Sequence, residues 1–331
     1  MLATASDSSA DTAHSVTLAN LSPATTYHFR VVAVSDNGTT TYSADATFKT
    51  IGGQISITII SPADGASIAG NRVMVTGTIT NPANVETGVT VNGIPAAVSN
   101  NQFAVNDVPL NAGQNTITVI ATDVNGATAT KSITVNAVIA ENFIQLSAYP
   151  DSGTAPLEVT LRINGTFSIT DSVITVTGPG AVEQLESETP EEYRYRIPTA
   201  GLYTFIATVT GPGGISYTDS MSINVSSVEH IDTILRARWD GFKNAMNNHD
   251  IDSAMLNFSS DSQEIYREIY TALKPILSDV VNELNSATIN FISSDDYTAI
   301  YEILVTRNGK TYSFQLQFEK DASGIWKIFK F

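Results

Sequence analysis

The fold of this chain is decided by stretches such as Val89-Thr90-Val91-Asn92-Gly93-Ile94-Pro95-Ala96. Apolar and polar side chains alternate up to Asn92-Gly93, a dipeptide that favours a tight hairpin turn because both of its residues tolerate positive φ. Asn37-Gly38 and Asn125-Gly126 repeat the signal, within a region rich in Thr, Val, Ser, Asn and Gly that runs from Ser15 to Val225. Short alternating strands with turns about every eight to twelve residues are typical of β-sandwiches. The pattern therefore predicts a mainly β protein over this region.

The length of 331 residues predicts two to four independently cored domains, since a single domain is usually shorter. A hydrophobic fraction of 42% is enough for packed cores. Shifts in composition place the expected boundaries, and the last shift, near Val228, leads into a sequence with helical periodicity. The predicted domains are residues 1–50, 51–137, 138–226 and 227–331.

Charge and composition exclude several kinds of function. A net charge of −16 argues against nucleic acid as a partner, because phosphate binding requires clustered Lys and Arg. No apolar run reaches the roughly 18 to 20 residues that cross a bilayer, so no membrane span is expected. The absence of cysteine excludes disulfides, thiolate metal sites and a cysteine nucleophile, and it fits exported bacterial repeat proteins.

The first predicted domain carries Leu21-Ser22-Pro23-Ala24-Thr25-Thr26-Tyr27, followed by the alternating run from Tyr27 to Val34. This motif resembles that of a fibronectin type III module, and the resemblance implies that Tyr27 forms a tyrosine corner. Ser15 to Leu18 is the strand expected before it. Only about half of the roughly 100 residues of such a sandwich are present. We therefore expect either a truncated N-terminus or completion of the module by a strand from another chain.

The second and third predicted domains resemble two other sandwich families. The Val91-Asn92-Gly93 turn and the strand entry from Gly113 to Val119 are similar to those of bacterial immunoglobulin-like modules of the glucodextranase domain B type. The opening from Ala148 to Leu157 and the strand from Gly201 to Val209 resemble a polycystic-kidney-disease (PKD) module. The sequence departs from that family between Ser172 and Val176, so a divergent PKD-like sandwich is expected.

The fourth predicted domain combines helices with a final β-meander. A stripe of apolar residues at three-and-four spacing predicts an amphipathic helix, which Ser226 or Ser227 caps. Asp252 is the expected cap of a short second helix, and Pro275 suits the first turn of a later one. The four expected strands are Thr288 to Ile292, Thr298 to Thr306, Thr311 to Glu319 and Trp326 to Phe331. The fold class is thus tandem immunoglobulin-like sandwiches followed by an α+β domain.

The order of these elements and the ending Gly324-Ile325-Trp326-Lys327-Ile328-Phe329 resemble the nuclear-transport-factor-like cone family. The resemblance implies that a curved sheet wraps the helices and encloses a pocket. The residues that we expect there are Trp239, Tyr266, Tyr270, Tyr301 and Tyr312. Their spacing is equally compatible with core packing, and the sequence leaves this alternative open.

No set of residues with catalytic spacing stands out. His249-Asp250 is the one neighbouring His–acid pair, and we expect it in a solvated turn. The four histidines are too scattered for a metal site. Asp64, Asp123 and Asn125 could provide oxygen ligands for calcium between sandwich modules, although Asp123 to Gly126 is equally explained as a hairpin. We predict no catalytic residue, and no cofactor apart from this calcium ion.

The function predicted from these features is a non-enzymatic extracellular or cell-surface protein of structural or adhesion type. Short linkers at Ala137 to Asn142 and Ser226 to Val228 would make its sandwiches a semi-rigid spacer that presents the C-terminal domain to a protein or surface polysaccharide. One alternative is a small-molecule-binding or isomerase-like C-terminal domain. Another is a self-assembling filament subunit whose incomplete first module accepts a strand. We expect secretion, with the signal peptide lost by truncation, since Met1 to Asp7 does not resemble one.

Overall fold

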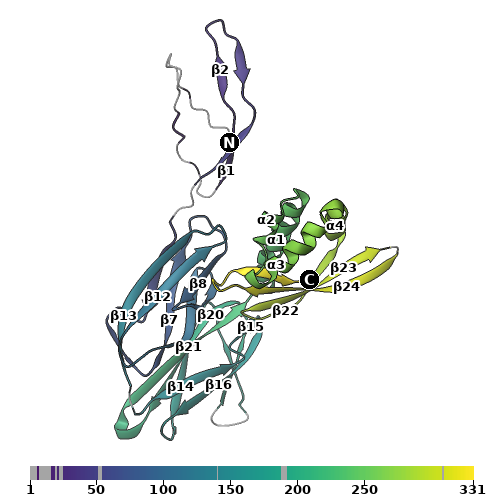
Figure 1. Cartoon of the computed structure of the whole chain (residues 1–331). Coiled ribbons are helices and arrows are strands. Elements are labelled where there is room, and N and C mark those ends of the chain that lie inside the picture. Colours follow the sequence, from purple (N-terminus) through teal and green to yellow (C-terminus); the bar gives the residue numbers. More distant parts are fainter. Residues whose placement is uncertain are drawn as a thin grey trace. The chain divides into compact units, whose positions relative to one another are not determined.

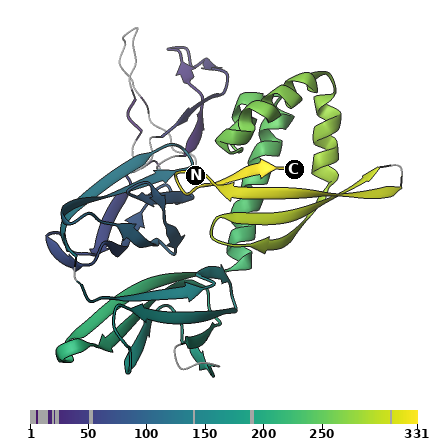
Figure 2. The same ribbon diagram turned by 60° about the horizontal axis from the view of Figure 1, so that its bottom comes forward.

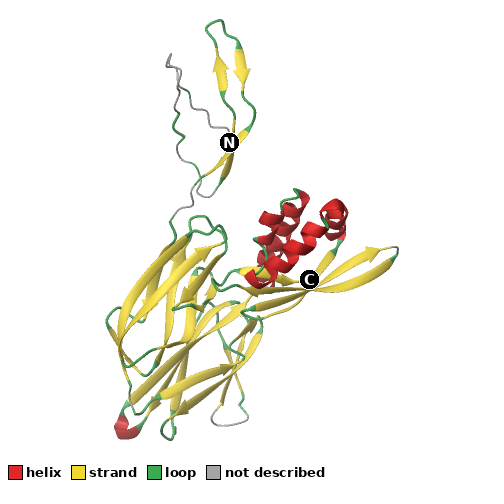
Figure 3. Ribbon diagram, viewed as in Figure 1, coloured by secondary structure: helices red, strands yellow, loops and turns green. Residues whose placement is uncertain are grey.

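The computed structural model describes residues 6, 16–18, 21, 25–50, 54–139, 141–187, 192–307 and 309–331. The chain divides into two compact units, one made of Met1–Ile55 with Asn81–Val85 and the other of Ser56–Thr80 with Glu86–Phe331. The second unit holds two β-sandwiches, then four α-helices, then a last sheet (Figures 1 and 3). The predicted mainly β fold with a C-terminal α+β region is confirmed. Contacts join these three parts, and the third module and the C-terminal region each have a hydrophobic core cluster of their own. The domain boundaries expected from the sequence stay a prediction.

The first unit contains two antiparallel strand pairs. They are β1 (Thr26–Phe29) with β4 (Ala46–Lys49), and β2 (Val32–Val34) with β3 (Thr40–Tyr42). The predicted turn at Asn37-Gly38 joins β2 to β3, and Gly38 has a φ of 81°. Tyr27 stacks on Phe48 with 5.8 Å between ring centroids. Residues 22–24 of its motif lie outside the described residues, and 16–18 form no strand, so the strand expected from Ser15 is not found where the chain is described.

The next sandwich pairs a four-stranded sheet with a five-stranded one. The first sheet contains, in order, β10 (Ala97–Ser99), β11 (Gln102–Pro109), β7 (Arg72–Thr80) and β5 (Ser56–Ser61). The second contains β6 (Ala66–Ala69), β13 (Thr128–Val138), β12 (Gly113–Asp123), β8 (Thr87–Val91) and β9 (Ile94–Pro95). The hairpin predicted at Asn92-Gly93 joins β8 to β9, with φ values of 48° and 82°. The alternating side chains that the sequence indicated, such as Val89, Val91 and Ile117, are fully buried.

The third module is a sandwich of two four-stranded sheets. One contains β14 (Ile144–Tyr149), β16 (Leu157–Gly165), β19 (Glu192–Ile197) and β18 (Glu183–Leu185). The other contains β15 (Ser152–Thr154), β21 (Ser216–Ser226), β20 (Gly201–Thr210) and β17 (Ser172–Thr177), and a short 3₁₀ turn at Pro212–Gly214 joins β20 to β21. Tyr203 is buried, and its hydroxyl donates to the carbonyl of Thr199 at 2.9 Å. A bond of this type, from a tyrosine to upstream backbone, was predicted for Tyr27.

The C-terminal region places its helices against one face of a sheet (Figure 2). The helices are α1 (Val228–Asn247), α2 (Ile251–Met255), α3 (Ser260–Ala272) and α4 (Leu277–Ser286), with a 3₁₀ turn at Lys274–Ile276. The sheet contains β22 (Thr288–Ser294), β23 (Thr298–Arg307), β24 (Lys310–Lys320) and β25 (Trp326–Lys330). Ser227 caps α1, as predicted. Asp250 caps α2, which corrects the prediction of Asp252, the second residue of the helix.

Candidate functional site

Asn106 ties the two sandwiches of the second unit together. Its side-chain amide donates to the carbonyl of Ser222 at 2.8 Å and accepts from the Ser222 N–H at 2.8 Å, so that it imitates a neighbouring strand. A bulge in β11 between Val105 and Val108 presents this side chain. Arg72 adds a second link, because its guanidinium lies 3.0 Å from Asp107 and 3.5 Å from Asp219. Burial raises the pKa of Asp219, which also accepts from a backbone N–H of the third module.

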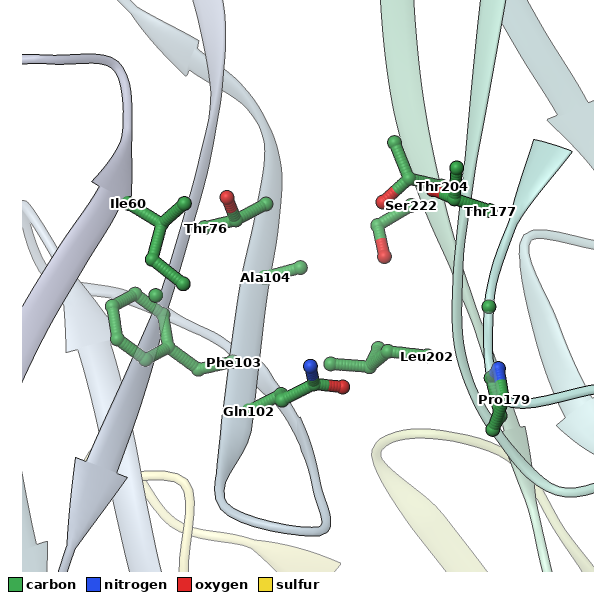
Figure 4. Close-up of a pocket in the computed structure, with 12 residues that line it drawn as sticks. Ile60, Thr76, Gln102, Phe103, Ala104, Thr177, Pro179, Leu202, Thr204 and Ser222 are labelled. Atoms are coloured by element: carbon green, nitrogen blue, oxygen red, sulfur yellow. The ribbon is translucent and has the colours of Figure 1, made fainter. Parts of the chain in front are cut away.

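Beside this tie lies a groove of about 400 Å³ between the two sandwiches. One wall comes from β5, β7 and β11 and the other from β17, β20 and β21, and Figure 4 shows the labelled side chains of the two walls facing each other. The lining residues are all uncharged, and they are Ile60, Thr76, Gly77, Gln102, Phe103, Ala104, Thr177, Gly178, Pro179, Leu202, Thr204 and Ser222. This groove could not be predicted from the sequence, because its residues come from six separate strands or their ends.

Glu86, just before β8, links the second module directly to the C-terminal region. One carboxylate oxygen lies 2.6 Å from the Arg238 guanidinium on α1, and the other accepts from the backbone N–H of Trp326 at 2.8 Å. The two charged side chains are only 16% and 13% exposed. Loss of one partner from a largely buried ion pair lowers the free energy of unfolding much more than loss of one partner from a surface pair.

Gly88 allows the same two parts to approach closely. A Cβ placed on this residue would lie 2.0 Å from the carbonyl oxygen of Ser323, in the turn between β24 and β25. Any larger residue at position 88 would displace that turn. Glycine is therefore required here by contact with a segment more than 200 residues away.

A third link joins the third module to the C-terminal region. The side-chain amide of Asn224, on β21, donates to Asp296 at 2.5 Å. Burial raises the pKa of Asp296 and lowers that of Lys320, while each charge favours the ionised form of the other. The Lys320 ammonium also lies over the Trp326 ring, 5.3 Å from its centroid. The negative charge of Glu86 acts on Lys320 as well, so this cluster receives groups from all three modules.

The predicted pocket residues of the C-terminal region occupy its core, with one exception. Trp239, Tyr270 and Tyr301 are at most 4% exposed, and Tyr266 packs against the same cluster. The Tyr266 hydroxyl exchanges hydrogen bonds with the Phe331 backbone at 3.0 and 2.9 Å. Tyr312 is 45% exposed and lies outside this cluster. The structure thus gives four of the five a packing role, and their binding role stays a prediction.

One polar group is embedded in this core. The Tyr301 hydroxyl donates to Asp232 at 2.8 Å, and Asp232 also pairs with Arg236 at 2.7 Å. Burial, followed by the bond to Asp232, raises the pKa of Tyr301. The guanidinium of Arg236 in turn donates to the carbonyl of Ile289 at 3.0 Å. This network connects α1 to two strands of the sheet, and no local sequence pattern predicted it.

The residues predicted for calcium are not brought together. Asp64 accepts from the backbone N–H and the hydroxyl of Thr134, at 2.8 and 3.0 Å. Asp123 accepts from the backbone N–H groups of Asn125 and Ala127 in the hairpin that follows β12. The register of β12 and β13 separates Thr134 from that hairpin by six residues, or about 20 Å at about 3.4 Å per residue. Both aspartates therefore serve turns at different places, which corrects their assignment to one site.

His249 follows the C-cap of α1 and has a φ of 57°. Its neighbour Asp250 is exposed, and its pKa is lowered mainly by the hydroxyl of Ser253. His28 contacts Asp45 at 2.7 Å across β1 and β4, and both side chains are largely exposed. Within the described ranges no group of three acidic, histidine or cysteine side chains is placed to hold a metal ion. None of the helices in this part of the chain is both long and apolar enough to cross a membrane.

Fold and contacts together define a modular β-sandwich protein with a C-terminal α+β region. Residues 55–139 match the family model "Glucodextranase, domain B", and residues 4–49 match "Fibronectin type III domain". The two corresponding predictions from sequence are confirmed. The PKD-like and nuclear-transport-factor-like resemblances of the later domains stay predictions.

Solved structures with similar parts include protocadherin gamma B7 extracellular cadherin domains 1–4. The identity is 12%, 60% of this chain and 57% of that chain are covered, and the TM-score is 0.21. The fibronectin(III)-like modules of CbhA from Clostridium thermocellum show 15% identity, cover 53% of this chain and 96% of theirs, and give a TM-score of 0.20. The chain thus spans little more than half of the protocadherin fragment. No curated protein sequence matches the chain.

Proposed function

We propose that this protein is a non-enzymatic extracellular or cell-surface component of structural or adhesion type, whose sandwiches hold the C-terminal region in a fixed position. The observation that carries the proposal is the buried contact of Glu86 with Arg238 and Trp326. It joins modules that are not adjacent in the sequence. Partners of the presented region would be a protein or a surface polysaccharide.

Three separate links support a rigid role. Asn106 connects the second module to the third, Asn224 connects the third to the C-terminal region, and Glu86 connects that region back to the second module. Because the links close a circuit, no module of the second unit can swing without breaking at least one of them. This adds to the short connection at Ser227, the one residue between β21 and α1.

The setting outside the cell is supported by composition and by the family matches. Fibronectin type III and immunoglobulin-like sandwiches are common in extracellular and cell-surface proteins. A chain without cysteine crosses an oxidising compartment without forming wrong disulfides. These features support a bacterial secreted protein.

Spin-label distance measurements on the full chain test the rigid presentation. The protein has no cysteine, so Lys131→Cys with Lys274→Cys labels the second module and the C-terminal region uniquely. Both positions are exposed. We expect a distance distribution as narrow as that of a control pair within the second module, Lys131→Cys with Asn101→Cys. A broad or multi-peaked distribution for the first pair alone would contradict the proposal.

A further inference from the structure

The groove between the two sandwiches offers hydrogen-bonding groups without charge. Thr76 and Gln102 lie on one wall, and Thr177, Thr204 and Ser222 lie on the other (Figure 4). A hydroxyl can both donate and accept a hydrogen bond, and an amide does both at different atoms. A charged ligand would lose water here without meeting a counter-charge, which is unfavourable. The lining therefore selects for an uncharged molecule with several polar groups.

The same walls also present apolar surface. The lining also includes Ile60, Pro179 and Leu202, and Ile60 is 60% exposed. A purely apolar ligand would leave the hydroxyls without partners. A sugar ring combines hydroxyls at its rim with C–H groups on its faces, so it matches both kinds of surface at once.

The shape of the groove is fixed before any ligand arrives. Asn106 holds the backbone of Ser222 by two hydrogen bonds, and Arg72 bridges Asp107 and Asp219. Its volume of about 400 Å³ falls within the range of about 300 to 1,000 Å³ that is usual for small-ligand sites. A preformed site does not spend binding free energy on ordering its own walls.

Ser222 supplies an independent indication of a ligand. The residue is only 4% exposed, and its Oγ has no hydrogen-bond partner among the described residues. Buried hydroxyls nearly always have such a partner, because leaving one unpaired is unfavourable. Figure 4 shows the Ser222 oxygen on the wall that faces Thr76 and Ala104.

From these observations we propose that the groove binds a small neutral saccharide, with Thr204 and Ser222 as hydrogen-bonding residues and Leu202 as the apolar contact. The proposal goes beyond the structural role given above and does not depend on it. It assigns a ligand site to the face between two modules, where neither the predicted pocket nor the predicted calcium ligands lie.

Saturation-transfer NMR and calorimetric titration of the full chain with maltose, cellobiose and lactose test the proposal. The affinities for glucose and for its charged analogue glucuronate are compared in the same way. We expect millimolar binding of at least one neutral sugar, and binding of glucuronate weaker than that of glucose by about tenfold, because its charge has no partner. Thr204→Val should weaken binding about fivefold through loss of one hydrogen bond. Thr208→Val is the matched control, four residues further along the same face of β20 but outside the lining, and it should leave binding unchanged.

Ser222→Ala separates ligand binding from a purely structural role. Removing an unpaired buried hydroxyl should raise the unfolding temperature of the free protein, and it should also weaken sugar binding. Leu202→Trp, which fills the groove, should abolish binding while the fold remains intact by circular dichroism. The titrations also include N-acetylglycinamide, a neutral amide without a sugar ring. The proposal is overturned if no neutral sugar binds, or if glucuronate binds as well as glucose. It is likewise overturned if N-acetylglycinamide binds more tightly than any sugar, or if Thr208→Val weakens binding as much as Thr204→Val.

Discussion

Replacing Glu86 by glutamine keeps the size of the side chain but removes the charge that faces Arg238. Loss of one partner from a buried ion pair costs about 3–5 kcal/mol, because the remaining charge stays desolvated. Here both side chains keep some exposure, 16% and 13%, and the glutamine oxygen can still accept from the Trp326 N–H. We therefore expect Glu86→Gln to lower the free energy of unfolding by about 2–3 kcal/mol.

Urea unfolding followed by tryptophan fluorescence measures this loss, because both tryptophans, Trp239 and Trp326, lie in the C-terminal region. Glu158→Gln is the control, since Glu158 is 57% exposed, lies 3.6 Å from its arginine and should cost at most about 0.5 kcal/mol. Arg238→Met combined with Glu86→Gln should recover part of the loss, because no unpaired charge remains at position 238, while Lys320 still loses the favourable charge of Glu86. If Glu86→Gln costs no more than the control, or if the two changes are simply additive, the link is not an energetic one.

Three further changes probe other parts of the chain. Gly88→Val should lower the free energy of unfolding by about 2–3 kcal/mol in urea, because its Cβ would overlap the Ser323 carbonyl, and an unaltered midpoint would contradict this. Asp64→Asn should lower the melting temperature at pH 7. Hydrogen bonds from Thr134 hold the pKa of the Asp64 carboxyl below its usual value of 3.8 in the folded protein. The stability that the carboxylate adds is therefore present above pH 3.8 and is lost as the pH falls through the pKa of the folded state. The difference between the melting curves should then vanish in acid, and EDTA should leave both curves unchanged. Tyr301→Phe should lower the free energy of unfolding in urea by about 1–2 kcal/mol, because the hydrogen bond to Asp232 on α1 is lost. An unchanged free energy of unfolding would show that this bond does not stabilise the fold.

Local sequence pattern was enough to predict many strands of the second unit and the first helix. The alternation before Asn92-Gly93 and the positive φ that this dipeptide tolerates led to the β8–β9 hairpin. The serine pair Ser226-Ser227 led to the start of α1, and the structure shows that Ser227 is the cap. These features depend on neighbours within a few residues. Period and turn chemistry are therefore sufficient to identify them.

The links between modules could not be predicted in this way. Asn106 and Ser222 are 116 residues apart, and Glu86 and Arg238 are 152 residues apart. A polar residue on the outer face of a strand has the same pattern whether it meets water or another module. Gly88 lies inside a strand, and its φ is not positive, so backbone conformation does not require a glycine there. A glycine inside a strand often marks the close approach of another segment, but the sequence does not identify that segment.

Spacing alone also left the role of the candidate site residues open. Helical and strand spacing placed Trp239 and Tyr301 on the inward faces of their elements, which the structure bears out by burial. Spacing does not say whether an interior is filled by other side chains or left open. Likewise, two aspartates in turns share a composition signal, and only the strand register shows that Asp64 and Asp123 lie far apart.

The bond from the Trp326 N–H to Glu86 has an evolutionary consequence. A backbone amide is supplied by every residue except proline, so this half of the contact places no demand on which side chain stands at position 326. The other half requires an acid at position 86 to be matched by a base at position 238. Among descendants of the same ancestor, positions 86 and 238 should therefore change together or not at all, while the side chain at position 326 is constrained by its burial in the core and not by this bond.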